Sequence, residues 1–442
     1  MDRKGLKGLF APAALTPDGW ISDTSIYFDA HGVIERLEPG LSDSLLHRAK
    51  GPVVPGMTNL HSHAFQRAMT GRTHSFTSAD DNFWSWRASM YDFVEEMGPE
   101  DLESLATGLY ADMLAQGYTS VCEFHYVHHD PSGNPYTDPA EMSKAIVRAA
   151  RTSGIGLTLL PVLYRYGGFG GIDIGRGQRR FFHTVDDYLK LVEILTAESE
   201  ATADFVLGYA PHSLRAIDPE DIGLLVQHRS ATGAGRPMHI HISEQMKEVE
   251  DCLSWCGKRP VEWLIDNAPI DENWCLVHST HVTADELDAV ARTGAVVGLC
   301  PTTEADLGDG VFPFREFLRR GGVYGIGSDS NVSTSPSEEI RLLEYIQRAY
   351  WKTRNISGQS SKMGAGTLRY LEALQGGRQA SGMKSGRLES GSRADLLVLD
   401  ASHRLLEGKS PDEMLNAHLF SGGSETIQTV IVRGHAIEYS LK

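Results

Sequence analysis

The sequence predicts an α/β fold, namely a closed (β/α)8 barrel accompanied by a small β-sandwich domain that both chain ends build. Three observations lead to this prediction. The 442 residues exceed one ordinary compact domain but suit a large barrel plus a smaller module. From about residue 55, short apolar runs alternate with longer helical patterns. Both ends of the chain carry short alternating patches that are typical of strands.

Eight apolar runs are the candidate barrel strands. Helix-start signals lie between them, because Asp138 is placed to cap one helix, and Asp218-Pro219 and Thr283-Ala284 open two others. The runs are Met57–Leu60, Thr119–Phe124, Leu157–Leu163, Phe205–Ala210, Met238–Ile242, Trp274–Val277, Ala295–Leu299 and Val323–Gly327.

A doubly wound open sheet is the alternative architecture. It would bind a nucleotide phosphate at a glycine-rich turn after a strand, and no such turn follows any of the eight runs. The barrel is therefore favoured.

The chain ends predict the second domain. Alternating patches occur at Val33–Leu37, Ala394–Asp400 and Ile427–Val432, with turn-rich pieces beside them. We expect residues 1–54 and 385–442 to form one composite β-sandwich, and residues 55–384 to form the barrel.

Composition narrows the class of protein. Lys and Arg number 41 against 58 Asp and Glu, a formal charge of −17, which argues against nucleic acid and anionic membrane as partners. The five cysteines are odd in number and scattered, unlike a disulfide framework. The chain shows neither a signal-peptide pattern nor an apolar stretch near the ~20 residues that cross a bilayer. We expect a cytoplasmic protein.

Polar and titratable residues follow the apolar runs, where the carboxyl ends of barrel strands meet. One such residue would be unremarkable, but every run ends in at least one, and four or more ends carry histidine. This joint pattern predicts a metal-dependent enzyme rather than an inert barrel. The residues are His61 and His63, then Glu123, His125 and Tyr126, then Tyr164 and Arg165, then His212 and Arg215, then His239, His241 and Glu244, then His278, then Thr302, Thr303 and Glu304, and finally Asp329.

Imidazole and carboxylate groups are natural zinc ligands. His61 and His63 project from the same face of a strand, since side chains alternate along it. Taken alone, this pair is more simply read as two surface histidines. Asp329 and one histidine of the fifth strand would complete a metal site. Alternation does not choose between His239 and His241, but His241 is nearer the strand end and is favoured.

Two further residues could move protons. Glu244 lies just past the fifth strand, within reach of a metal-activated water, although alone it reads as a helix-start acid. His278 could orient the nucleophile, although it could equally be a core or capping histidine. No lysine ends the third or fourth strand as a bridging ligand, so we expect one metal ion rather than two.

Arg87 lies beside Trp84 and Trp86 in the long segment between Phe65 and Pro99. An arginine held by aromatic side chains near the barrel mouth suits bidentate binding of a carboxylate. A solvated surface arginine is an equally good reading of the residues alone.

The strand-end residues resemble those of the amidohydrolase superfamily. The shared features are the His-X-His after the first strand, His-Ile-Ser-Glu at the fifth, the histidine after the sixth and Ser-Asp-Ser after the eighth. The resemblance covers nearly the whole chain. Its longer segments are Pro55–Gly71, Tyr118–Asp130, Leu157–Gly171, Tyr209–Arg215, His239–Cys252 and Gly298–Asp309.

The closer resemblance carried by these longer segments implies deimination of N-formimino-L-glutamate to N-formyl-L-glutamate and ammonia, a step of histidine degradation. It implies one zinc ion per subunit, although iron or manganese could use the same ligands. The implied metal ligands are His61, His63, His241 and Asp329, and the implied catalytic residues are Glu244, His278 and Asp329. Gln66, Arg87, Tyr126, His212 and Arg215 are implied to bind the substrate. Asn331 is a departure, since histidine is usual there in the family.

Other functions remain open at this stage. A related deaminase acting on a purine, pyrimidine or triazine base is the nearest alternative, and an amide or lactam hydrolase is another. A non-catalytic zinc protein is disfavoured, because a decayed enzyme would more plausibly have lost one residue of the set. We expect a small dicarboxylate substrate and a homodimer, and the segment between Phe65 and Pro99 is a candidate for crossing to the partner subunit.

Overall fold

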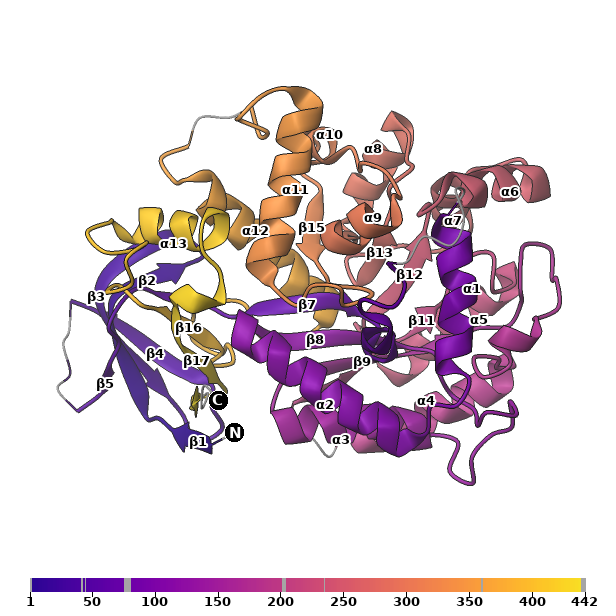
Figure 1. The fold of residues 1–442 in the computed structure, drawn as a ribbon, viewed down its shortest axis with the longest axis horizontal. Helices are drawn as coiled ribbons and strands as arrows, with labels where there is room; N and C mark the ends of the chain where they lie inside the picture. The colour runs from indigo at the N-terminus through magenta and orange to yellow at the C-terminus, as the bar shows by residue number, and fades with distance from the viewer. Residues whose placement is uncertain are drawn as a thin grey trace.

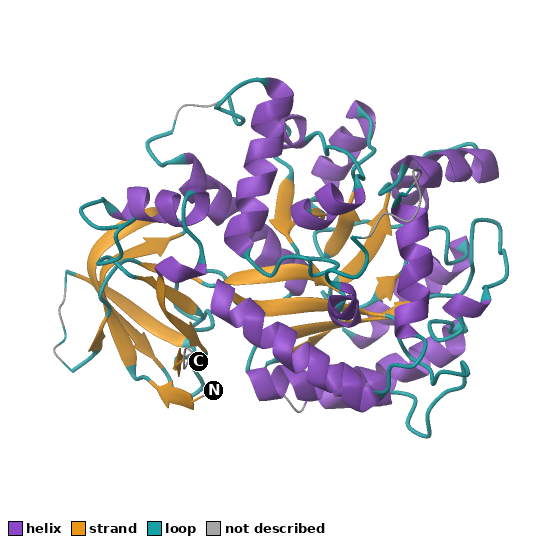
Figure 2. Cartoon of the chain, viewed as in Figure 1, coloured by secondary structure: helices purple, strands orange, loops and turns teal. Residues whose placement is uncertain are grey.

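The structure is a computed structural model that describes residues 2–40, 43, 45–74, 81–200, 204–233, 235–358 and 361–438. A ring of parallel strands surrounded by helices occupies most of the molecule, and a curved sheet lies to its left in Figure 1. Figure 2 shows the same division, with strands inside and helices outside the ring.

Eight strand positions form the ring, and they match the eight apolar runs. The strands are β7 (Met57–Ser62), β8 (Tyr118–His125), β9 (Gly156–Leu163), β10 (Phe205–Leu207) with β11 (Ala210–Pro211), β12 (Met238–Ile242), β13 (Trp274–His278), β14 (Val296–Leu299) and β15 (Val323–Ile326). Neighbours pair in parallel within two groups, β7 to β11 and β12 to β15.

Two seams join these groups into a barrel. At one, the main chain of His239 donates to Tyr209 across 2.9 Å. At the other, the amides of Ser328 and Asp329 donate to the His61 carbonyl at 3.1 and 2.9 Å. The predicted (β/α)8 barrel is confirmed.

Helices cover the outside of the barrel. They are α2 (Pro99–Gln116), α3 (Glu141–Ser153), α4 (Val185–Glu200), α5 (Pro219–Thr232), α6 (Met246–Cys256), α7 (Pro260–Asn267), α8 (Ala284–Thr293), α9 (Pro301–Leu307), α10 (Phe314–Arg319), α11 (Pro336–Trp351) and α12 (Ala365–Ser381). Asp218 and Thr283 are the N-caps of α5 and α8 as expected. The cap predicted at Asp138 is wrong, because its carboxylate and carbonyl form a turn with Ala140 and Glu141, and α3 begins only at Glu141.

The segment before α2 has structure of its own. It holds the short 3-10 helix η1 (Ala64–Met69) and helix α1 (Phe83–Val94), which stands beside the barrel mouth. Residues 75–80, within the segment proposed to cross to a partner subunit, lie outside the described residues. A second short turn, η2 (Arg176–Gln178), lies between β9 and α4.

Both chain ends contribute to one nine-stranded sheet among the described residues. Its strands curl around a small core of their own, which includes Leu9, Ile26, Leu396 and Ile431. The domain boundaries at 54/55 and 384/385 stay predictions. The strands are β1 (Asp2–Gly5), β2 (Gly8–Thr16), β3 (Gly19–Phe28), β4 (Ile34–Pro39), β5 (His47–Arg48), β6 (Val53–Pro55), β16 (Leu396–Leu399), β17 (Ile427–Val432) and β18 (His435–Glu438), with α13 (Pro411–Phe420) and η3 (Ser424–Thr426) between β16 and β17.

Close packing of α12 on β15 depends on glycine. A Cβ on Gly376 would lie 1.8 Å from the Tyr324 carbonyl oxygen, so only a residue without a side chain lets the helix approach the strand this closely. By contrast, a Cβ on Gly108 of α2 would meet nothing within 4 Å.

This contrast gives a stability prediction. Alanine favours a helix over glycine by roughly 0.5–1 kcal/mol, so Gly108→Ala should raise the free energy of unfolding by about that amount. Gly376→Ala should instead lower it by about 1–3 kcal/mol, because the new methyl group pushes α12 off the barrel. Denaturant unfolding of both variants measures the difference, and a Gly376→Ala protein as stable as wild type would contradict the packing account.

Candidate active site

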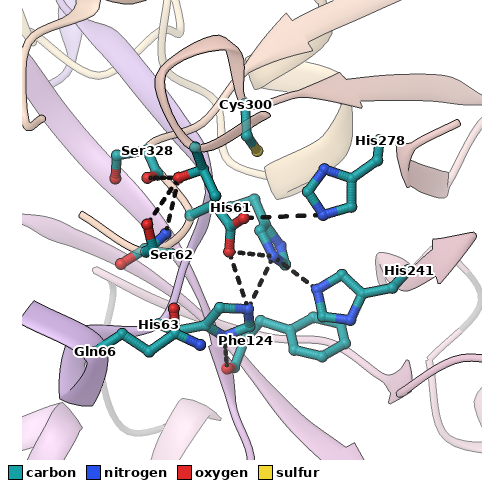
Figure 3. A network of polar contacts seen from close by, with 12 residues as sticks. His61, Ser62, His63, Gln66, Phe124, His241, His278, Cys300 and Ser328 are labelled. Atoms are coloured by element: carbon teal, nitrogen blue, oxygen red, sulfur yellow. Dashed lines mark hydrogen bonds and ion pairs between the residues drawn. The ribbon is translucent and has the colours of Figure 1, made fainter. Parts of the chain in front are cut away.

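Three imidazole rings converge at the carboxyl end of the barrel. His61 lies in β7, His63 directly follows it, and His241 lies in β12. The Nε2 atom of His61 is 3.1 Å from that of His63 and 2.9 Å from that of His241. Asp329, which follows β15, places Oδ1 3.2 Å from His63 Nε2 and 3.6 Å from His61 Nε2. Figure 3 shows the labelled rings turned toward one common point.

This donor set fits a divalent cation. His63 Nδ1 donates to the Phe124 carbonyl at 2.8 Å, which leaves the Nε2 lone pair directed at the centre. Burial lowers the pKa of His61 to about 3, so the ring is neutral near pH 7. Burial alone would raise the pKa of Asp329, but its close contacts with His61 and His63 hold that pKa below its usual value. Neutral imidazoles and an ionised carboxylate in one buried cluster are ligands that zinc accepts.

The two histidines of β12 have different surroundings. His239 Nε2 lies 2.8 Å from the Ala380 carbonyl, deep in the barrel and away from the cluster. His241 carries the Nε2 atom that reaches His61. The structure thus places His241 among the candidate ligands and His239 in the core.

Glu244 and His278 lie together beside the cluster. The Oε1 atom of Glu244 and the Oδ2 atom of Asp329 each lie 3.8 Å from His278 Nε2. On its other side, His278 Nδ1 lies 3.3 Å from Glu304. Burial opposes protonation of His278, but the surrounding charges of Glu244, Asp329 and Glu304 outweigh it and raise its pKa to about 10. Burial also raises the pKa of Glu244.

A sharp turn aims Glu244 at this cluster. Ser243 has a φ of 52°, a left-handed conformation that is uncommon outside glycine. The carboxylate of Glu248 accepts the main-chain N–H groups of Ser243 and Glu244 at 3.2 and 3.1 Å. Glu248, in the first turn of α6, therefore stabilises the sharp turn at Ser243 and Glu244.

The cluster opens into a cavity whose wall carries two arginines. Arg87 on α1 is held by two tyrosine hydroxyls, with Nε 2.5 Å from Tyr91 and an Nη atom 3.1 Å from Tyr164. In the part of the chain that the structure describes, no carboxylate pairs with Arg87. Arg215 is 8% exposed, its nearest carboxylate is Glu244 at 3.8 Å, and its Nε has no hydrogen-bond partner among the described residues.

The remaining predicted substrate-binding residues line the same cavity. Gln66 in η1 donates from Nε2 to the Tyr126 hydroxyl at 2.9 Å, while its Oε1 has no partner among the described residues. His212 lies with its ring 5.0 Å from that of His241. The structure therefore brings all the predicted site residues to one cavity or to the cluster at its base.

Some residues of the site were not singled out from the sequence. Tyr91 follows Arg87 by four positions on α1, a spacing that places both side chains on one face of that helix. That four-residue spacing could have indicated Tyr91 from the sequence. Glu248 lies on α6, whereas Glu244 precedes that helix. His128 and His129 bond to the carbonyls of Val162 and Phe182, outside the metal cluster.

Comparison with known proteins identifies the family. The amidohydrolase family matches residues 53–437, so the chain belongs to the amidohydrolase family and is a metal-dependent hydrolase that acts on carbon–nitrogen bonds. The predicted superfamily is confirmed.

Two relatives cover almost the whole chain. The formimidoylglutamate deiminase of Pseudomonas aeruginosa is 48% identical over 429 residues, which span 97% of this chain and 94% of that protein. The crystal structure of an amidohydrolase from Brucella melitensis is 43% identical and superposes with a TM-score of 0.90 over 98% of this chain and 94% of its own.

More distant relatives share less of the sequence. A 5-methylthioadenosine/S-adenosylhomocysteine deaminase of Natronomonas pharaonis is 27% identical over 86% of this chain and 80% of its own length. A guanine deaminase structure from C. acetobutylicum has a TM-score of 0.79 over 98% of this chain and all of its own, but at 20% identity it supports the fold alone.

Two expectations from composition can also be compared with the structure. All five cysteines are unpaired, as their number and spacing predicted. Among the described residues, none of the helices combines the length and the apolar character that a membrane span requires.

The two histidines of β12 provide a test of the metal ligands. We expect His241→Gln to lose bound zinc, because it removes one of the converging nitrogens. His239→Gln should keep zinc, since a glutamine amide can still donate toward Ala380. Zinc per subunit after dialysis, measured by elemental analysis, decides the point. Loss of zinc from His239→Gln but not from His241→Gln would reverse the assignment.

Proposed function

We propose that the protein hydrolyses N-formimino-L-glutamate to N-formyl-L-glutamate and ammonia, with one zinc ion per subunit held by His61, His63, His241 and Asp329. The observation that carries the proposal is the pairing of this ligand cluster with two arginines that face the same cavity. The identity to the formimidoylglutamate deiminase of Pseudomonas aeruginosa supports the same substrate.

The arginines suit a dicarboxylate. Each guanidinium can bind a carboxylate through two parallel N–H donors. Arg87 is oriented by the hydroxyls of Tyr91 and Tyr164 and pairs with no carboxylate of the described residues, and the buried Nε of Arg215 has no hydrogen-bond partner among them. A buried charge or donor without a partner is costly, and substrate carboxylates would relieve that cost at Arg87 and at the Arg215 Nε. In a chain of net charge −17, two such groups at one cavity indicate an anionic substrate.

The chemistry then follows from the groups around the cluster. A bound zinc ion lowers the pKa of water and so supplies a nucleophile near neutral pH. Glu244 accepts the proton of the attacking water and delivers it to the departing nitrogen. His278, positioned by Glu304, donates a hydrogen bond from Nε2 toward the incoming oxygen. The terminal C–N bond of the formimino group breaks and ammonia leaves. The resulting formyl group stays bonded to the nitrogen of glutamate.

Residues on the cavity wall would fix the substrate in place. Gln66 presents an Oε1 that has no partner among the described residues, an acceptor suited to an N–H of the amidine. Tyr126 and His212 pack around the same space with their rings 5.6 Å apart. These contacts would hold the formimino carbon over the cluster while the arginines hold the carboxylates.

Three further properties belong to this proposal. The ligands would also accept iron or manganese, so zinc is proposed from the donor set and from its use in the family. The homodimer and the cytoplasmic location that we infer from the sequence stay predictions. The absence of nucleic acid and membrane partners follows from the acidic charge in the same way.

The proposal is tested by ammonia release from a set of substrates. The purified, zinc-loaded protein should act on N-formimino-L-glutamate but not on guanine or cytosine. N-formiminoglycine lacks the side-chain carboxylate, so kcat/KM should fall about 10- to 100-fold with the loss of one charge-assisted contact. Turnover of guanine or cytosine, with no activity on N-formimino-L-glutamate, would instead favour a deaminase that acts on a base.

The proton-transfer role of Glu244 is tested by Glu244→Gln. This variant keeps the shape of the side chain but cannot accept the proton of water. Turnover should fall about 10²- to 10⁴-fold while the zinc content stays at one per subunit. Glu250→Gln, at an exposed position six residues further on, is the matched control and should behave as wild type. A Glu244→Gln enzyme with normal turnover would refute the role.

A further inference from the structure

A buried polar network lies behind the candidate metal ligands, at the seam where β7 meets the turn after β15. It consists of Asn59 and Ser62 from β7, and of Ser328 and Asn331 from the turn, and all four residues are completely buried. Figure 3 shows the labelled Ser62 and Ser328 on the opposite side of His61 from His241. The network therefore faces away from the substrate cavity.

Asn331 connects the two sides of this seam. Its Nδ2 donates to the His63 carbonyl at 3.0 Å and to Ser62 Oγ at 3.3 Å. Its Oδ1 accepts from Ser328 Oγ at 2.6 Å. Asn59 extends the network, with Nδ2 2.6 Å from Ser328 Oγ and Oδ1 accepting the Ser328 amide at 3.0 Å. Both polar atoms of the Asn331 side chain are therefore engaged.

The main chain of Asn331 is fixed as well. Its N–H donates to Ser328 at 2.9 Å, and its carbonyl accepts from Arg67 at 2.8 Å. Its φ of 61° lies in the left-handed region, which asparagine tolerates better than most residues. Between these anchors lies Asp329, also left-handed at a φ of 48°, whose carboxylate reaches His61 and His63.

We propose that Asn331 is a positioning residue for the cation site, because it holds the strand end that carries His61 and His63 against the turn that carries Asp329. The inference rests on the proposed metal ligands and goes beyond them. A neutral imidazole has one donor and one acceptor nitrogen, so a histidine at position 331 could not donate to both His63 and Ser62 while accepting from Ser328. The network is thus fitted to asparagine in this chain.

Two substitutions separate positioning from electrostatics. Asn331→Ala removes the connection and takes one hydrogen-bond partner away from buried polar atoms of Ser62, Ser328 and His63. Asn331→Asp keeps the shape but removes the donors and sets a carboxyl oxygen against the His63 carbonyl. Its added negative charge near a cation would by itself strengthen cation binding. The positioning role instead requires that both variants bind the cation less tightly.

The experiment is zinc release from the zinc-loaded, full-length protein to a chromophoric chelator. Loss of an outer hydrogen-bond partner of metal ligands typically costs 10- to 100-fold in metal affinity. We expect release to accelerate by about that factor in both variants. Asn416→Ala is the control. Asn416 lies on α13, where its side chain donates to the Asp412 carbonyl and accepts from the Gly366 amide, and neither partner belongs to the Asn331 network. This control should release zinc at the wild-type rate.

The outcomes distinguish this inference from the proposed function. If wild-type protein fails to bind zinc, or His241→Gln binds it as wild type does, the ligand set itself is wrong. If wild type binds zinc and both Asn331 variants release it at the wild-type rate, the ligand set stands and the positioning role is overturned. Tighter binding by Asn331→Asp would also overturn it. Should Asn331→Ala not fold, Asn331→Asp and Ser62→Ala carry the test.

Discussion

The hydrogen bonds that close the barrel between β7 and β15 are the constraint on which the site depends. They bring His61 and His63, from the beginning of the barrel, against Asp329, which follows its last strand. If the ring opened there, the ligands would separate, because no other described strand pairing joins β7 to β15. The fold thus brings together donor groups that are distant in the sequence.

Burial then gives these groups their chemistry. It keeps His61 neutral and hence able to bind a cation, while close contacts with His61 and His63 hold the pKa of Asp329 low and keep the carboxylate ionised. The same exclusion of water leaves Arg215 at the cavity wall with an Nε donor that has no partner in the described part of the chain. The cavity therefore has residues suited to a cation and residues suited to carboxylates, and Glu244 contacts one residue of each group, His278 and Arg215. A substrate with an amidine at one end and two carboxylates at the other matches this division.

Much of this arrangement could be predicted from the sequence, because barrel strands are short apolar runs and their ends carry the functional residues. Prediction from local sequence signals failed where the same residues could form more than one local structure, as at Asp138. Helix α13 was not expected, although Ser410 and Glu413 form a capping box that could have indicated it. The Asn331 network was beyond reach, because Ser62 and Asn331 are 269 residues apart and only the closed ring brings them into contact. Strand alternation likewise could not separate His239 from His241, since both share a face and differ only in depth.

The central claim is that this site removes the terminal nitrogen of a formimino group, and the identity of the products tests it most directly. Proton NMR of N-formimino-L-glutamate incubated with the zinc-loaded protein distinguishes the two possible C–N cleavages. The account predicts N-formyl-L-glutamate with one equivalent of ammonia, because Glu244 protonates the nitrogen that is not tethered by the carboxylates. Formation of L-glutamate and formamide would contradict it.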